Sequence, residues 1–137
     1  MEYNFFYENL IFIPSIAFIL AVIIKGFLSK LKIGTFNLRR ALSSGWMPSV
    51  HSAVVTSLTT AVGLKLWIWH DLFAICLGFT VIIIYDAINV RYEAGLHAMA
   101  INKLLWEKFK ESLWHKPSEA FAGSILWIFT AFFIYFL

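Results

Sequence analysis

Four long stretches of this 137-residue chain each carry at most one charged residue, and they constrain the fold more than any other feature. A helix needs roughly 20 predominantly apolar residues to cross the hydrocarbon core of a bilayer. Four such stretches leave no polar shell in a chain with 61% hydrophobic and 14% charged residues. The sequence therefore predicts four transmembrane helices, over residues 9–24, 52–69, 72–90 and 120–137.

The predicted fold class is all-α, an integral membrane helical bundle with an additional amphipathic helix along the interface over residues 96–114. No repeat or glycine-serine linker divides the chain, so residues 1–137 are expected to form a single domain. The apolar composition argues against a nucleic-acid partner despite a net charge of +3. A single cysteine excludes an internal disulfide and a cysteine-rich zinc site.

The charges between the apolar stretches predict the orientation of the protein in the membrane. Residues 25–44 hold five lysines and arginines and no acid, and residues 91–117 hold another five basic residues. Cytoplasmic loops carry an excess of lysine and arginine, so both segments are expected in the cytoplasm and both termini outside. We expect the membrane to be a bacterial inner or plasma membrane.

The segment before the second apolar stretch has the features of an anion-binding helix start. Pro48 suits the first turn of a helix, where its missing N–H would be unpaired anyway. The backbone donors of a helix N-terminus favour an anion, most often phosphate. Ser49 and His51 would add donors in the same turn. The alternative is an ordinary capped helix start with an interfacial histidine.

The third apolar stretch contains an ionisable residue, Asp86, which makes it a functional candidate by default. If the helix continues past the membrane, Glu93 lies one turn before His97 and orients its imidazole. Arg91 then faces away, unless the chain bends at Gly95. The alternative is a salt-bridge patch at a helix end. At about 100° per residue, one stripe of the helix holds four polar residues: Asp86, Asn89, Glu93 and His97.

A third polar cluster opens the last apolar stretch. Pro117 suits a first helical turn, and Glu119 is an acid near a helix N-terminus, where the helix dipole favours it. Capping explains most of this pattern. On the predicted topology, however, the cluster shares a membrane face with His51 and His97, so His115, Glu119 and Asn89 are predicted to support a common anion site.

Three short motifs resemble the signatures of the type 2 phosphatidic acid phosphatase superfamily. Lys32 with Arg39 resembles the first signature, PSVH at residues 48–51 the second, and Arg91 with His97 the third. Longer strings look like the divergent branch of that superfamily, small membrane proteins described as acid phosphatase/vanadium-dependent haloperoxidase-related. These strings are MPSVHS at 47–52, YDAINVR at 85–91 with Gly95, and HKPSEA at 115–120.

The resemblance implies a phosphatase that works through a phosphohistidine intermediate without a cofactor or metal. It makes His97 the nucleophile and His51 the general acid, roles that an imidazole with a pKa near 6.5 can fill. Ile101 stands where the superfamily usually has an aspartate, and Asp86 or Glu93 is expected to orient His97 instead. The resemblance assigns the phosphate oxygens to four residues: Lys32, Arg39, Ser49 and Arg91.

A site at headgroup depth favours a lipid phosphate or diphosphate as the substrate. One alternative is metal-assisted hydrolysis by a divalent cation on Asp86, Glu93 and His97, with His115 and Glu119 nearby. Another is a non-catalytic protein that binds lipid headgroups or serves as an assembly partner. Better-known members of the superfamily have six spans, so a homodimer is a further expectation.

Overall fold

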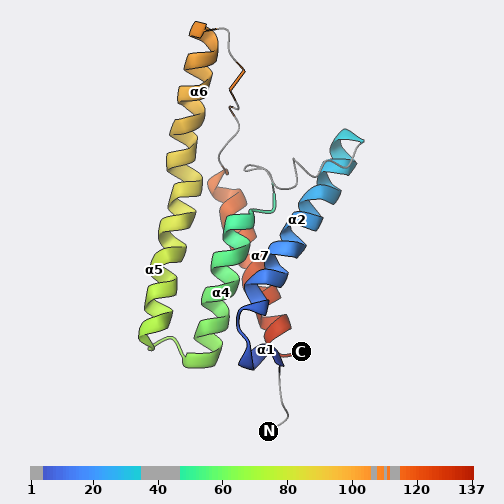
Figure 1. Cartoon of the computed structure of the whole chain (residues 1–137), viewed down its shortest axis with the longest axis vertical. Helices are drawn as coiled ribbons and strands as arrows, with labels where there is room; N and C mark the ends of the chain where they lie inside the picture. The colour runs from blue at the N-terminus through green and yellow to red at the C-terminus, as the bar shows by residue number, and fades with distance from the viewer. Residues whose placement is uncertain (1–4, 35–46, 106–107, 110, 112–114) are drawn as a thin grey trace.

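The computed structural model describes residues 5–34, 47–105, 108–109, 111 and 115–137 (Figure 1). Every regular element in these residues is helical, which confirms the predicted all-α membrane bundle. The elements are α1 (Phe5–Glu8), α2 (Phe12–Ile33), α4 (Val50–Leu66), α5 (Asp71–Tyr85), the π-helical turn η1 (Asp86–Val90), α6 (Arg91–Leu105) and α7 (Pro117–Tyr135).

Three helical segments of the described chain are long and apolar enough to cross a membrane: Phe12–Leu31, Asp71–Leu105 and Pro117–Tyr135. The remaining predicted span, residues 52–69, corresponds to α4, which has 17 residues and reaches only the lower limit for a crossing. Figure 1 shows α1 and the last turn of α7 at the same end of the bundle. The N-termini of α4 and α7 lie toward the opposite end.

The first membrane helix extends well beyond its predicted end at residue 24. Apolar residues such as Phe27 and Leu31 continue the helix past Lys25, and it ends at Gly34. Gly34 has φ +81°, a left-handed conformation that favours glycine after a helix. The predicted span ends before Lys25 because this lysine is the first charged residue after the apolar stretch. In the structure, α2 contains Lys25.

Helix α4 is the centre of the bundle and packs against α2, α5 and α7. Small side chains allow these close approaches, as is usual between helices in lipid. Ala17, Ala21 and Ala53 are buried against Trp127, which joins α2, α4 and α7 in one cluster. A second cluster, nearer α1, contains Ile13, Ala61, Ala131, Ile134 and Tyr135.

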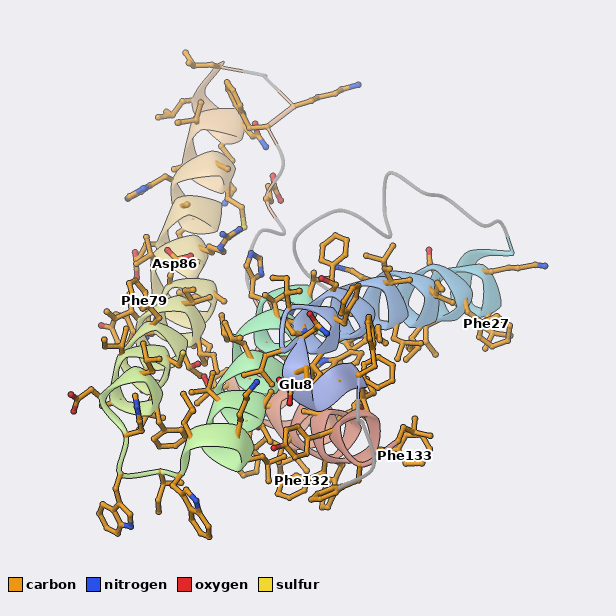
Figure 2. All side chains as sticks on the ribbon, turned by 60° about the horizontal axis from the view of Figure 1, so that its bottom comes forward. Glu8, Phe27, Phe79, Asp86, Phe132 and Phe133 are labelled. Carbon is orange, nitrogen blue, oxygen red and sulfur yellow. The ribbon has the colours of Figure 1, made fainter. Side chains whose placement is uncertain are left out.

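Helix α5 packs against the bundle almost entirely through α4. The hydroxyl of Thr80 donates to the carbonyl of Val55 at 3.2 Å and lies 2.8 Å from the hydroxyl of Thr59. Thr80 is the one buried residue of α5, and most of the large apolar side chains of this helix are exposed. In Figure 2, Phe79 on α5 and Phe132 and Phe133 on α7 point away from the bundle, as side chains in contact with lipid would.

Helix α6 continues α5 through η1 as one rod of 35 residues, Asp71–Leu105 (Figure 1). The helical character predicted from residue 96 onward is confirmed as far as Leu105, but this segment is not a separate interfacial helix. Trp114, the predicted end of that helix, lies outside the described residues. The chain has no helix breaker here, and the polar residues after Asp86 are accommodated by a π-helical turn.

Gly63 provides a test of the α4–α5 contact. A Cβ at this position would lie 2.9 Å from the ring of Phe73, whereas a Cβ at Gly78 would meet nothing within 4 Å. We expect Gly63→Val to lower the free energy of unfolding by about 1–3 kcal/mol through overpacking. Gly78→Val is the matched control. Thermal unfolding in detergent measures both variants, and equal effects would contradict this packing.

Candidate functional site

The π-helical turn pairs Asp86 with Arg91. The backbone N–H of Arg91 donates to the carbonyl of Asp86, five residues earlier, and its Nε donates to Asp86 Oδ2 at 2.9 Å. Both side chains are partly exposed, at 33% for Arg91 and 40% for Asp86. The prediction that Arg91 faces away from Asp86 assumed regular α-helical spacing throughout, and the wider π turn overturns it.

The same turn holds the segment that precedes α7. The carbonyl of Ala87 accepts a hydrogen bond from the backbone N–H of His115 at 3.1 Å. Ala87 is buried, and so is His115, whose exposure is 1%. The turn that positions Arg91 therefore also fixes the backbone of His115 beside it.

His115 is held from its other side by the first turn of α7. The backbone N–H of Lys116 donates to Glu119 Oε2 at 3.1 Å, which caps the helix as the sequence predicts. The same carboxylate oxygen lies 3.6 Å from His115 Nδ1. Pro117 occupies the first turn of α7, also as predicted. Glu119 thus serves the helix cap and the histidine together.

His51 faces His115 across the junction of α4 and α7. The two imidazole rings have their centroids 6.4 Å apart and stand edge to face, at 72°. Close packing makes this possible, because a Cβ at Gly123 would lie 3.7 Å from the backbone of Ser49. The Nδ1 atoms of His51 and His115 are buried and have no hydrogen-bond partner among the described residues.

Ser49 lies at the N-cap of α4, not in its first turn. Its hydroxyl accepts a hydrogen bond from the backbone N–H of Ser52 at 3.3 Å, and both serines are buried. The helix begins at Val50, two residues after Pro48. Ser49 therefore satisfies a backbone donor of α4, and within the described residues its own hydroxyl proton has no acceptor.

Helix α2 contributes a cation, Lys25, that the sequence pattern indicated only as a signal of membrane orientation. Lys25 is only 3% exposed, and its charge acts on both His51 and His115. Ser29, one turn later, is also buried, and its hydroxyl has no hydrogen-bond partner within the described part of the chain. The apolar residues after Lys25 were the available signal that this lysine lies inside the helix.

These residues form one polar cluster at the N-terminal ends of α4 and α7, here called the histidine cluster: Lys25, His51, Asp86, Arg91, His115 and Glu119. Two cations and two carboxylates surround two imidazoles. Helix N-termini and cations stabilise charge on a phosphoryl group, and imidazoles act as nucleophiles or proton carriers. The arrangement has the groups needed for phosphoryl transfer.

Several predicted site residues lie apart from the histidine cluster. His97 is exposed on α6, about 9 Å of helical rise beyond Arg91. Glu93 and Asn89 are also exposed, and no ion pair joins Glu93 to His97 among the described residues. Helix α6 continues past Gly95, the position at which the sequence allowed a bend. The side chain of Lys32, and Arg39 altogether, lie outside the described residues.

The predicted donor set for a divalent cation is not assembled in this structure. Asp86 pairs with Arg91, while Glu119 lies beside His115. Within the described residues, no group of three or more histidine, cysteine, aspartate or glutamate side chains is arranged to hold a metal ion.

A family model described as "Divergent PAP2 family" matches residues 6–130 of the chain. The chain belongs to this family. The predicted relationship to the divergent branch of the phosphatidic acid phosphatase superfamily is therefore confirmed. This divergent PAP2 family member is also similar to a protein of Bacillus subtilis (strain 168) described as uncharacterized membrane protein YuiD. They are 38% identical over 104 residues, which represent 61% of this chain and 66% of the relative.

The chain spans just under two thirds of the length of that relative. No solved structure matches this divergent PAP2 family member.

The pH dependence of stability provides a test of the buried state of His115. Burial and the positive charge of Lys25 lower the pKa of His115 from 6.5 to about 4. Between these values the unfolded chain binds a proton that the folded protein does not, so acidification favours unfolding. We expect the melting temperature to fall as the pH decreases from 6.5 to 4, with little contribution from this group above 6.5.

His115→Gln removes the titrating group and should make this fall shallower, whatever its effect on stability at neutral pH. Melting curves at a series of pH values, recorded in the same detergent, measure the slope. The same slope in both proteins would show that His115 is not held neutral in the folded state.

Proposed function

We propose that this divergent PAP2 family member is a membrane-embedded phosphohydrolase that removes a phosphate or diphosphate group from a lipid. The observation that carries the proposal is the pair of imidazoles, His51 and His115, facing each other 6.4 Å apart at the ends of two helices. Lys25 and Arg91 bring positive charge to the same place. Family membership supports a phosphatase-like reaction.

Arg91 is the principal phosphate-binding residue in this proposal. Its Nε donates to Asp86, and this contact orients the guanidinium group while leaving its two terminal nitrogens for phosphate oxygens. Lys25 adds a second positive charge close to both histidines. Ser49, at the start of α4, offers a hydroxyl donor. Lys32 and Arg39 complete the phosphate-binding set that the resemblance implies.

His51 is the proposed general acid that protonates the leaving oxygen of the lipid. It lies in the first turn of α4, half buried, within reach of the charges of Arg91 and Asp86. The reaction proceeds through a phosphohistidine and uses no cofactor. The resemblance assigns the attacking imidazole to His97, whereas the histidine cluster itself contains His115.

The surroundings of the histidine cluster support a lipid as the proposed substrate. It lies at the ends of helices whose outer faces expose large apolar side chains, so an acyl or polyprenyl chain can stay in the membrane while its headgroup reacts. The proposed orientation places the cluster at the cytoplasmic face and both termini outside. Residues 1–137 act as one domain in this proposal. The exposed face of α5 is the proposed contact surface of a homodimer.

Phosphate release tests the proposal directly. We expect the purified protein to release phosphate from phosphatidic acid or a polyprenyl diphosphate, and His51→Ala to lower the rate at least a hundredfold, as loss of a general acid does. His70→Ala is the control, because His70 caps α5 at the other end of the bundle. The assay is run with and without EDTA, and EDTA-sensitive release would favour the divalent-cation alternative.

A protein that binds these lipids without releasing phosphate would contradict the phosphohydrolase proposal and support a headgroup-binding protein. Equal rates in the His51→Ala and His70→Ala proteins would remove His51 from the mechanism.

Arg91→Lys separates phosphate binding from chemistry. A lysine ammonium group cannot hold Asp86 and also present two coplanar donors to phosphate. We expect KM for the lipid phosphate to rise about tenfold, the effect of losing a bidentate contact worth roughly 1.4 kcal/mol. The matched control is Lys103→Arg, on an exposed position of α6. An unchanged KM in Arg91→Lys would show that the guanidinium group does not bind the phosphate.

A further inference from the structure

His97 is the nucleophile that the sequence motifs imply, but it is exposed on α6 and lies outside the histidine cluster. His115 is buried in that cluster and has its ring next to His51. We propose that His115 is the nucleophile that attacks phosphorus, and that Glu119 positions its imidazole. This inference rests on the proposed phosphohydrolase function and deepens it.

The positions of the two imidazoles allow both rings to reach one phosphoryl group. In an in-line transfer, the attacking nitrogen stands about 3–3.5 Å from phosphorus, and the acid lies about 2.6–3.2 Å from the leaving oxygen. The two nitrogens then lie on the order of 7 Å apart on opposite sides of phosphorus. The ring centroids of His51 and His115 are 6.4 Å apart, and the ring nitrogens lie away from the centroids, so this spacing is available when the two reacting nitrogens point to the same side of the pair and not directly at each other.

Glu119 gives His115 the tautomer that a nucleophile requires. The carboxylate oxygen Oε2 lies 3.6 Å from His115 Nδ1, slightly beyond hydrogen-bond distance, and its negative charge favours the tautomer with the proton on Nδ1. The lone pair then resides on Nε2. The carboxylate is itself held by the backbone N–H of Lys116, and the backbone of His115 is held by Ala87, so the imidazole has fixed neighbours on two sides.

The surroundings also keep the imidazole of His115 unprotonated. Its pKa is lowered to about 4, first by burial and then by the charge of Lys25, so the ring is neutral near pH 7. A neutral imidazole retains the electron pair that attacks phosphorus. Glu119 opposes this shift and would stabilise the positive charge that the ring acquires when the bond to phosphorus forms.

In the first step, the lone pair of His115 Nε2 forms a bond to phosphorus while the bond between phosphorus and the lipid oxygen breaks. The leaving oxygen takes a proton from protonated His51. In the second step, water attacks phosphorus, the N–P bond breaks and its electron pair returns to Nε2. Neutral His51 takes the proton of the water. The lipid alcohol and inorganic phosphate are released, and both histidines regain their starting states.

Mapping the phosphohistidine in the unmodified protein tests this assignment without a substitution. The protein is mixed with phosphatidic acid radiolabelled in its phosphate, denatured in alkali and digested with trypsin. His51, His97 and His115 fall in three different peptides, spanning residues 41–65 and 92–103 and beginning at residue 111. We expect the label in the peptide that begins at residue 111. Label in peptide 92–103 would overturn the role of His115 and leave the proposed phosphohydrolase function intact.

A protein that releases no phosphate from phosphatidic acid or a polyprenyl diphosphate would instead contradict the proposed function itself, and with it this assignment. Release without any labelled histidine would contradict the assignment alone. The two failures are therefore distinguishable in one experiment.

Two variants separate catalysis from structural support. His115→Gly opens a space for added imidazole, which should restore at least a tenth of the lost phosphate release if His115 is the nucleophile. His97→Gly is the matched control and should need no rescue. Glu119→Gln keeps an oxygen to accept from Lys116, so α7 remains capped, and we expect kcat to fall about tenfold with KM unchanged. Retained activity in His115→Gly without imidazole would overturn the proposal.

Discussion

An ionisable side chain within a membrane helix has to be paired or solvated, and Asp86 is paired with Arg91 through a π-helical turn. The histidine cluster depends on this turn. The wider spacing places Arg91 on the same face of the helix as Asp86. The carbonyl of Ala87, in the same turn, accepts a hydrogen bond from the backbone N–H of His115. A regular α-helix would direct the guanidinium group elsewhere. The turn therefore brings Arg91, on the third membrane helix, close to His115, which precedes α7.

The second feature of the histidine cluster is its balance of charge around the two imidazoles. Lys25 and Arg91 are matched by Asp86 and Glu119, so two cations can lie near the membrane without an uncompensated charge. A bound phosphate would add negative charge beside Lys25 and the start of α4, where backbone donors and positive charge favour it. His115 is neutral in its buried position because burial and the charge of Lys25 lower its pKa.

Most of the fold is predictable from the sequence, because the lengths of the apolar stretches and the charged residues between them indicate where the helices lie. The helical bundle, the proline at the start of α7 and the Glu119 cap all follow from such patterns. The histidine cluster is less predictable. A π turn inserts one extra residue per hydrogen-bonded ring and has no simple sequence signature, so the stripe based on 100° per residue placed Arg91 wrongly. The closeness of His51 and His115 depends on the packing of α4 against α7, which a linear pattern does not contain.

The most direct test uses the four histidines as probes of a single phosphate site. Vanadate, an analogue of phosphate in transfer, is titrated into the protein in detergent micelles while the imidazole C–H signals are followed by nuclear magnetic resonance. The structure predicts that His51 and His115 shift together at one vanadate affinity, while His70 and His97 stay unchanged. A shift of His51 together with His97, and not with His115, would contradict the histidine cluster as the phosphate site.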